Sequence, residues 1–122
     1  MGPVNWIAVA AAWGVAALLG VAFYGRRALP AKEPLRHAVA ALLLALVAAM
    51  MGHMFARVGP ATLADKPWLY AMMSGGLALA FAGPVLFIAY ARRDYPLRAA
   101  WADYGFWVLA YLAMGAMFWL LG

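Results

Sequence analysis

The sequence alternates between four long apolar stretches and three short polar connections. The apolar stretches cover residues 4–25, 35–57, 68–91 and 99–121. A helix rises about 1.5 Å per residue, so each stretch is long enough to cross a hydrocarbon core about 30 Å thick. The pattern therefore predicts an all-α protein, with residues 1–122 forming a single four-helix transmembrane bundle of two helical hairpins.

The connections carry residues that commonly begin or end helices. Pro34 and Pro96 stand just before the second and fourth apolar stretches, where proline suits the first turn of a helix. Gly59-Pro60 follows the second stretch, and Pro67 precedes the third. We therefore expect the second helix to stop at Gly59-Pro60 and the third to begin near Trp68.

Basic residues are distributed unevenly between the two sides of this topology. Arg57 and Lys66 lie on one side, and the other seven of the nine basic residues lie on the opposite side: Arg26, Arg27, Lys32, Arg36, Arg92, Arg93 and Arg98. Because basic loops stay in the cytoplasm, the two hairpin loops should face inward and both termini should lie outside. We expect these seven side chains to contact lipid headgroups.

Composition narrows the class of protein further. Hydrophobic residues make up 70% of the chain and charged residues only 11%, a balance far from that of soluble domains. In so apolar a chain, lipid headgroups explain the net charge of +5 better than nucleic acid does. The sequence has no cysteine, which excludes disulfides, thiolate catalysis and iron–sulfur clusters. We expect a multi-pass protein of the bacterial cytoplasmic (inner) membrane.

The two predicted hairpins resemble each other in sequence. Tyr24-Gly25-Arg26-Arg27 matches Tyr90-Ala91-Arg92-Arg93, and Pro34-Leu35-Arg36 matches Pro96-Leu97-Arg98. A duplication would relate the two hairpins by an axis normal to the membrane. Alternatively, one topological rule shaped the ends of both hairpins independently.

Asp103 is the candidate functional polar residue. It lies about one turn into the fourth predicted helix, where an ionisable group is costly. It is either a proton or cation site or the partner of a nearby arginine: Arg36, Arg92 or Arg98.

Pro84 is the candidate hinge. Within the third predicted helix it removes one backbone donor and leaves a carbonyl near Ala80 to be satisfied by another group. The sequence is compatible with a transport hinge and with a static kink.

Histidine and methionine are the candidate metal ligands. Under the predicted topology seven methionines fall in the outer halves of the helices around His53: Met50, Met51, Met54, Met72, Met73, Met114 and Met117. Imidazole and thioethers suit Cu(I), with His53, Met50 and Met54 as candidates, but methionine also fills irregular gaps between helices. His37 is too far along the same helix to share a haem with His53. We expect no cofactor, unless a partner subunit completes a haem or copper site.

Small residues recur at helical spacing. Ala10 with Gly14, Ala16 with Gly20, and Gly75 with Gly83 would each allow close approach of another helix. Whether that helix belongs to the same bundle or to a partner is left open by the sequence.

A family resemblance rests on motifs in both halves. The first helix contributes Asn5-Trp6, Gly20 and Phe23-Tyr24, and the second half contributes Gly75-Gly76, Pro84, Arg93-Asp94-Tyr95-Pro96-Leu97, Asp103-Tyr104-Gly105 and Met114-Gly115-Ala116. In these positions the chain resembles an uncharacterised bacterial family of four-helix membrane proteins, known only as a domain of unknown function. The resemblance implies a fold and a compartment but no reaction. The loop between the first two helices departs from the family pattern, being shorter and more basic.

No catalytic motif is apparent. The spans lack the central glutamate of small multidrug exporters, and the chain has no His-Glu-x-x-His motif or phosphate loop. We therefore expect a protein that is not an enzyme but a non-catalytic accessory, structural or assembly subunit of a larger respiratory or photosynthetic membrane complex. The alternatives are a homo-oligomeric carrier or channel for a small solute or ion, and a metal or haem binder at the outer face. The expected partners are membrane lipids and other integral membrane subunits or further copies of the chain.

Overall fold

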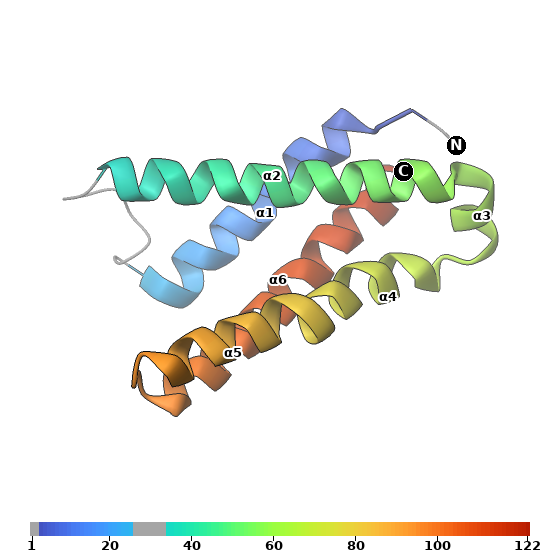
Figure 1. The fold of residues 1–122 in the computed structure, drawn as a ribbon. Helices are drawn as coiled ribbons and strands as arrows, with labels where there is room; N and C mark the ends of the chain where they lie inside the picture. Colours follow the sequence, from blue (N-terminus) through green and yellow to red (C-terminus); the bar gives the residue numbers. More distant parts are fainter. Residues whose placement is uncertain (1–2, 26–33) are drawn as a thin grey trace.

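The computed structural model describes residues 3–25 and 34–122, and these residues are helical almost throughout, with no strand among them (Figure 1). The elements are α1 (Trp6–Tyr24), α2 (Pro34–Val58), α3 (Pro60–Asp65), α4 (Trp68–Leu77), the π-helical segment η2 (Ala78–Ala82), α5 (Gly83–Arg92) and α6 (Leu97–Leu121). Because α4, η2 and α5 run on continuously, four helices are long and apolar enough to cross a membrane. The all-α, four-helix class is confirmed, and the chain is a multi-pass membrane protein.

Two antiparallel hairpins place the chain ends together. The first residues of α1, the last residues of α6 and the short helix α3 lie at one end of the bundle, which we call the terminal end (Figure 1). The end of α1, the start of α2 and the turn between α5 and α6 lie at the opposite end, which we call the loop end. The two ends are the two sides of the predicted topology.

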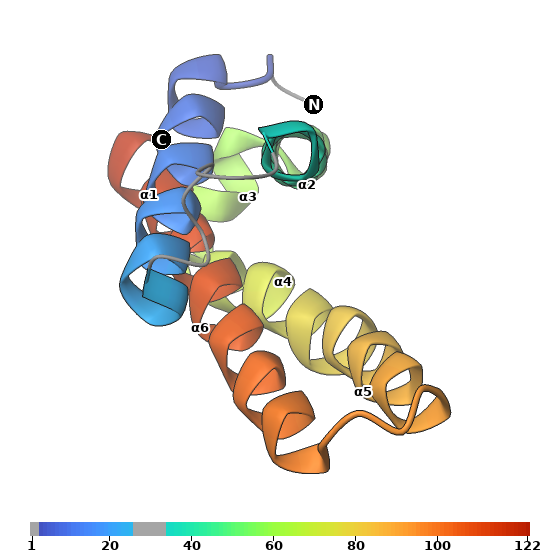
Figure 2. The ribbon, with the colours of Figure 1, turned by 90° about the vertical axis from the view of Figure 1, so that its left-hand side faces the viewer.

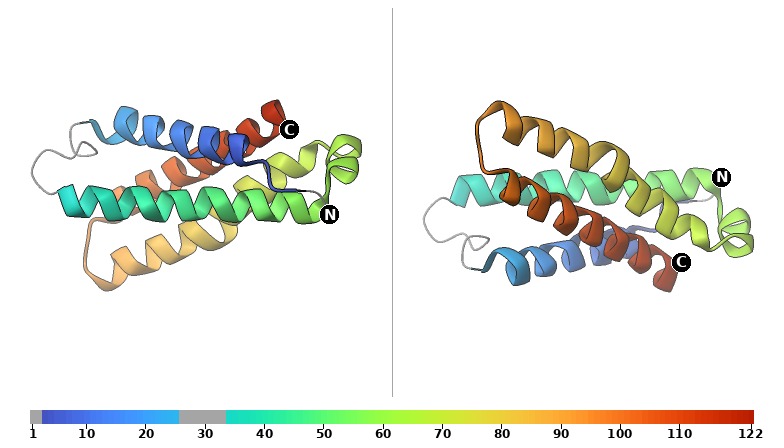
Figure 3. Two further views of the ribbon diagram at one scale, coloured as in Figure 1. Left: turned by 90° about the horizontal axis from the view of Figure 1, so that it is seen from above. Right: turned by 90° about the horizontal axis from the view of Figure 1, so that it is seen from below.

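The four spans pack in a row and do not form a closed bundle. α2 packs on α1, α1 packs on α6, and α6 packs on α4, η2 and α5. α2 has no comparable contact with α4 or α5, and the views along and across the bundle show these elements diverging toward the loop end (Figures 2 and 3). A two-fold axis that relates the hairpins would exchange the first span with the third and the second with the fourth. It would therefore place α2 as close to α5 as α1 is to α6. α2 and α5 lack such a contact, so the packing does not follow the sequence repeat.

Small residues on α1 let the hairpins meet. Ala8, Ala12 and Ala16 recur every fourth residue on one face of α1, and all three are buried. They pack with larger buried side chains of α2 and α6, among them Met51 and Met114. Alanine on one side and methionine on the other bring the backbones close and still fill the space between them.

Polar groups at the terminal end satisfy the helix ends there. Asn5 caps α1, because its Oδ1 accepts a hydrogen bond from the Ala8 amide at 3.1 Å. Its Nδ2 donates to the Leu121 carbonyl at the end of α6, at 3.0 Å. One side chain thus joins the first span to the last.

The connection between α2 and α4 differs from the prediction. Gly59 has a φ of 95°, which glycine adopts readily, and it turns the chain after α2. Pro60 then starts α3, a short helix that ends at Asp65 and that the sequence did not lead us to expect. The ends of the four long helices all lie within two residues of the predicted ones, and α1 starts at Trp6 because Asn5 caps it.

Candidate functional site

The Asp103 carboxylate lies inside the helix bundle near the loop end. It is on α6, six residues after Leu97 and so about 9 Å into the helix, and only 9% of the residue is exposed. The Tyr24 hydroxyl, from the last residue of α1, donates a hydrogen bond to Oδ1 at 2.6 Å. The Tyr90 hydroxyl, from α5, donates to Oδ2. Three separate spans therefore converge on one carboxyl group.

The sequence suggested Arg36, Arg92 or Arg98 as the partner of Asp103. In the structure, two tyrosine hydroxyls donate hydrogen bonds to its carboxyl group. Each oxygen of Asp103 accepts one O–H, so the two tyrosines occupy both oxygens of the carboxyl group. A signal for this was present in the sequence, since Tyr24 and Tyr90 are the first residues of the two matching Tyr-x-Arg-Arg motifs. The predicted headgroup contacts Arg26, Arg27 and Lys32 lie outside the described residues.

Aromatic rings surround the two tyrosines. Phe106, one turn after Asp103 on α6, stacks on Phe23 at 4.8 Å between ring centroids and meets Tyr24 edge-on at 5.2 Å. Tyr95, in the turn after α5, meets Tyr90 edge-on at 5.6 Å. These contacts limit the directions in which the hydroxyls can point, so the carboxylate has a preformed pair of donors.

A second polar contact follows at the next residue of α6. In the π-helical segment the Gly83 amide donates to the Ala78 carbonyl, five residues back. In this register the Leu79 carbonyl would accept from residue 84, which is Pro84 and has no N–H. The Tyr104 hydroxyl donates to the Leu79 carbonyl instead, at 2.5 Å. The freed carbonyl is thus one residue before the predicted Ala80, because the helix is locally π and not α.

Gly83 makes room for the Tyr104 ring. A Cβ atom at Gly83 would overlap the ring, so a side chain there is incompatible with the hydrogen bond to Leu79. Pro84, the predicted hinge, is the residue directly after Gly83, in the first turn of α5. Gly83, Pro84 and Tyr104 therefore form one local unit, in which the third span changes register.

Two consecutive residues of α6 thus hold the third span on either side of Pro84. Tyr104 binds the π-helical segment just before α5, and Asp103 binds Tyr90 near the end of α5. The two contacts link α6 to the third span at two points, one within the register change and one beyond it.

The candidate copper ligands have different surroundings. Met51 is buried in the core, whereas 62% of Met50 is exposed. Met50, Met51 and Met54 face a groove toward α4 and α5. His53 is exposed, with its Nδ1 2.8 Å from the Ala49 carbonyl and its ring edge-on to Trp6 of α1. The histidine and the groove-facing methionines thus point to different neighbours.

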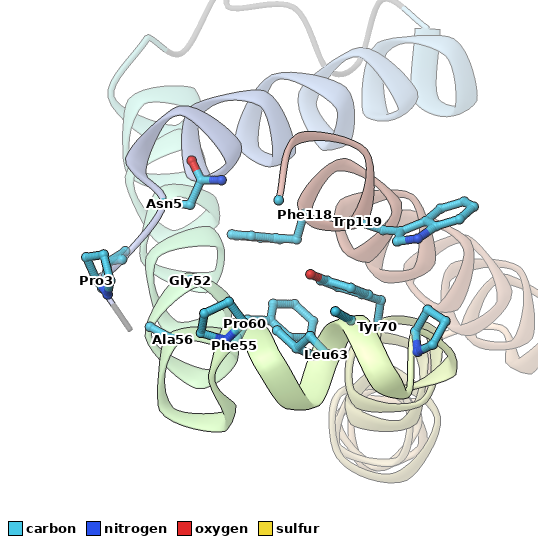
Figure 4. Close-up of a pocket in the computed structure, with 14 residues that line it drawn as sticks. Pro3, Asn5, Gly52, Phe55, Ala56, Pro60, Leu63, Tyr70, Phe118 and Trp119 are labelled. Atoms are coloured by element: carbon cyan, nitrogen blue, oxygen red, sulfur yellow. The ribbon is translucent and has the colours of Figure 1, made fainter. Parts of the chain in front are cut away.

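A cavity of about 780 Å³ opens at the terminal end (Figure 4). Its walls come from the start of α1, the end of α2, α3, the start of α4 and the end of α6. Figure 4 shows the Tyr70 and Phe118 rings side by side within it, with Leu63 of α3 below and Asn5 above. The walls are mainly apolar; the polar groups among them include the Asn5 amide, which is bonded to the two helix ends, and the Tyr70 hydroxyl. The sequence did not predict this cavity because α3 forms one of its walls.

Comparison with known proteins assigns no family to the chain. No protein-family model matches the chain, and searches of curated proteins and of solved structures give no match. The resemblance to the uncharacterised four-helix family stays a prediction.

Proposed function

We propose that this protein is a non-catalytic accessory or assembly subunit that packs against a larger respiratory or photosynthetic complex in the bacterial cytoplasmic membrane. The loop end would lie in the cytoplasm, because seven of the nine basic residues are at that end in the sequence. The observation that carries the proposal is the division of the membrane glycines into two groups.

One group of glycines is used within the chain. A Cβ atom at Gly52, Gly75, Gly83 or Gly115 would overlap a neighbouring side chain. The second group has open space where a Cβ would lie: Gly14, Gly20, Gly76 and Gly105. In lipid, small residues are favoured where another helix approaches closely. No described side chain or backbone of a neighbouring helix packs against the glycines of this second group.

Gly14 and Gly105 lie on the outward sides of their helices. At 100° per residue, Gly14 is opposite the buried face formed by Ala8, Ala12 and Ala16. Exposed Ala10 and Ala17 flank it by one turn on either side, so this side of α1 has a short shallow strip between the exposed side chains of Ile7 and Leu18. A strip of this kind supports docking of a partner's transmembrane helix, which the accessory-subunit function requires.

The test is native mass spectrometry of the protein tagged at its own locus and extracted gently. We expect it to co-purify with a larger membrane complex at fixed stoichiometry. Gly14→Leu and Gly105→Leu should fold but leave that complex, because each side chain would fill a space that the partner occupies. Ala22→Leu, at an exposed alanine of the same helix, is the matched control and should stay bound.

A wild-type protein that purifies alone, or a complex that survives both glycine substitutions, would contradict the proposal. A homo-oligomer that Gly14→Leu breaks would show that the strip binds further copies of the chain, and it would contradict the proposal as well.

A second candidate function is a homo-oligomeric carrier or channel. It is favoured by the buried Asp103, whose tyrosine partners lie on two other spans, and by the register change beside Pro84. It predicts that liposomes containing the protein show a proton or cation flux that Asp103→Asn abolishes. Absence of flux in the wild type, or equal flux in the variant, would exclude this role for Asp103.

A further inference from the structure

An apolar groove separates α2 from the third span. It has a volume of about 670 Å³ and is lined by Leu46 and Met50 of α2, Phe81 of η2, Val85 of α5 and, as its one hydroxyl-bearing residue, Tyr111 of α6. Leu46, Met50, Phe81 and Val85 are all more than half exposed, although they face this groove. Among the described residues, none covers the space between α2 and α5.

Both walls of the groove end in an arginine at the loop end. On α5 the stripe of Phe81 and Val85 continues at helical spacing through Ile88 to Arg92. On α2 the stripe of Met50 and Leu46 continues toward the start of the helix through Leu43 and Val39 to Arg36. Ile88, Leu43 and Val39 are exposed, so each wall remains apolar until its arginine.

The charge at the mouth of the groove is positive. Arg93 and Arg98 lie at the loop end together with Arg36 and Arg92. The described carboxylates at this end are Asp94, in the turn after α5, and Asp103, whose oxygens accept hydrogen bonds from two tyrosines. An occupant that suits the whole groove has a long apolar part and an anionic end.

We propose that the groove binds one anionic phospholipid from the leaflet at the loop end. An acyl chain lies between α2 and α5, and the phosphate lies between Arg36 and Arg92. Arg92 lies seven residues, about 10 Å, beyond Val85 on α5, and Arg36 lies ten residues, about 15 Å, before Leu46 on α2, so both arginines lie on the loop-end side of the groove. This proposal is independent of the docking surface at Gly14 and of the role of Asp103.

The groove opens sideways to the surroundings of the bundle, so an acyl chain enters it without moving α2 away from α5. The arginines at the mouth further favour an anionic headgroup over an apolar segment of a second copy.

The experiment is native mass spectrometry of the full chain released from nanodiscs of phosphatidylcholine with equal phosphatidylglycerol. We expect one retained phosphatidylglycerol per chain, in at least tenfold excess over phosphatidylcholine. Arg36→Gln with Arg92→Gln should reduce this excess at least fivefold. Arg57→Gln with Lys66→Gln, which changes the net charge equally at the terminal end, is the matched control and should leave it unchanged.

Val85→Trp fills the groove and keeps both arginines, so it should also remove the bound lipid. Circular dichroism during heating verifies that each variant is folded. The proposal is overturned by equal retention of the two lipids, by an equal loss in the matched control, or by lipid retention in Val85→Trp. It is also overturned by a dimer that Val85→Trp dissociates, since a second copy would then occupy the groove.

Discussion

The side-chain amide of Asn5 donates to the backbone carbonyl of Leu121, 116 positions later in the chain, at 3.0 Å. The same side chain accepts from the Ala8 amide, so it satisfies the start of the first span and the end of the last one together. The α1–α6 contact that places Tyr24 against Asp103 at the loop end is therefore fixed at the terminal end too.

Asn5→Ala should lower the free energy of unfolding by about 1–2 kcal/mol, because both hydrogen bonds are lost. Asn5→Asp keeps the acceptor for Ala8 but loses the donor to Leu121, and its effect should be smaller. Unfolding by sodium dodecyl sulfate in mixed micelles, followed by circular dichroism, measures both. Equal stability of Asn5→Ala and the wild type would show that the terminal contact has no net effect.

Tyr24→Phe and Tyr90→Phe should each destabilise the protein by about 1–2 kcal/mol, since each removes a hydroxyl from a buried carboxylate. In the Asp103→Asn background both effects should shrink, because the acceptor no longer carries a charge. A double-mutant cycle in the same micelles gives the coupling energy for each pair. Strictly additive effects would mean that the tyrosines stabilise the bundle by ring packing alone.

Tyr104→Phe should cost about 1–2 kcal/mol, because the Leu79 carbonyl loses its hydroxyl donor in a region without water. Pro84→Ala supplies a backbone N–H in the position that can serve this carbonyl. In the Pro84→Ala background Tyr104→Phe should therefore be nearly neutral. The same loss of stability in both backgrounds would contradict the assignment of this carbonyl to Pro84.

Gly83→Ala should destabilise the protein by about 1–3 kcal/mol, because the new methyl group overlaps the Tyr104 ring. Gly76→Ala, in the same span but with open space at this position, is the control and should be neutral or slightly stabilising. Thermal unfolding in detergent measures the two side by side. Equal effects would show that Tyr104 moves aside without cost.

The sequence located the four spans because burial in lipid demands long apolar stretches, whatever the helices pack against. It also showed that Pro84 would free a carbonyl, but the identity of that carbonyl depended on the π register, which hydropathy does not encode. The partners of Asp103 were missed because Tyr24 and Tyr90 are distant in sequence, and only the packing of α1 and α5 on α6 brings them together. The short helix α3 was missed for a similar reason. Its proline and glycine are typical of turns, and its buried Leu63 is explained only by the core it covers.

The Leu79 carbonyl has a consequence for how the protein enters the membrane. Its partner is Tyr104 of the following span, so the third span alone would carry an unbonded carbonyl into the hydrocarbon. During synthesis this span reaches full hydrogen bonding only once α6 has emerged from the ribosome beside it. The last two spans should therefore leave the insertion machinery for the lipid as a pair.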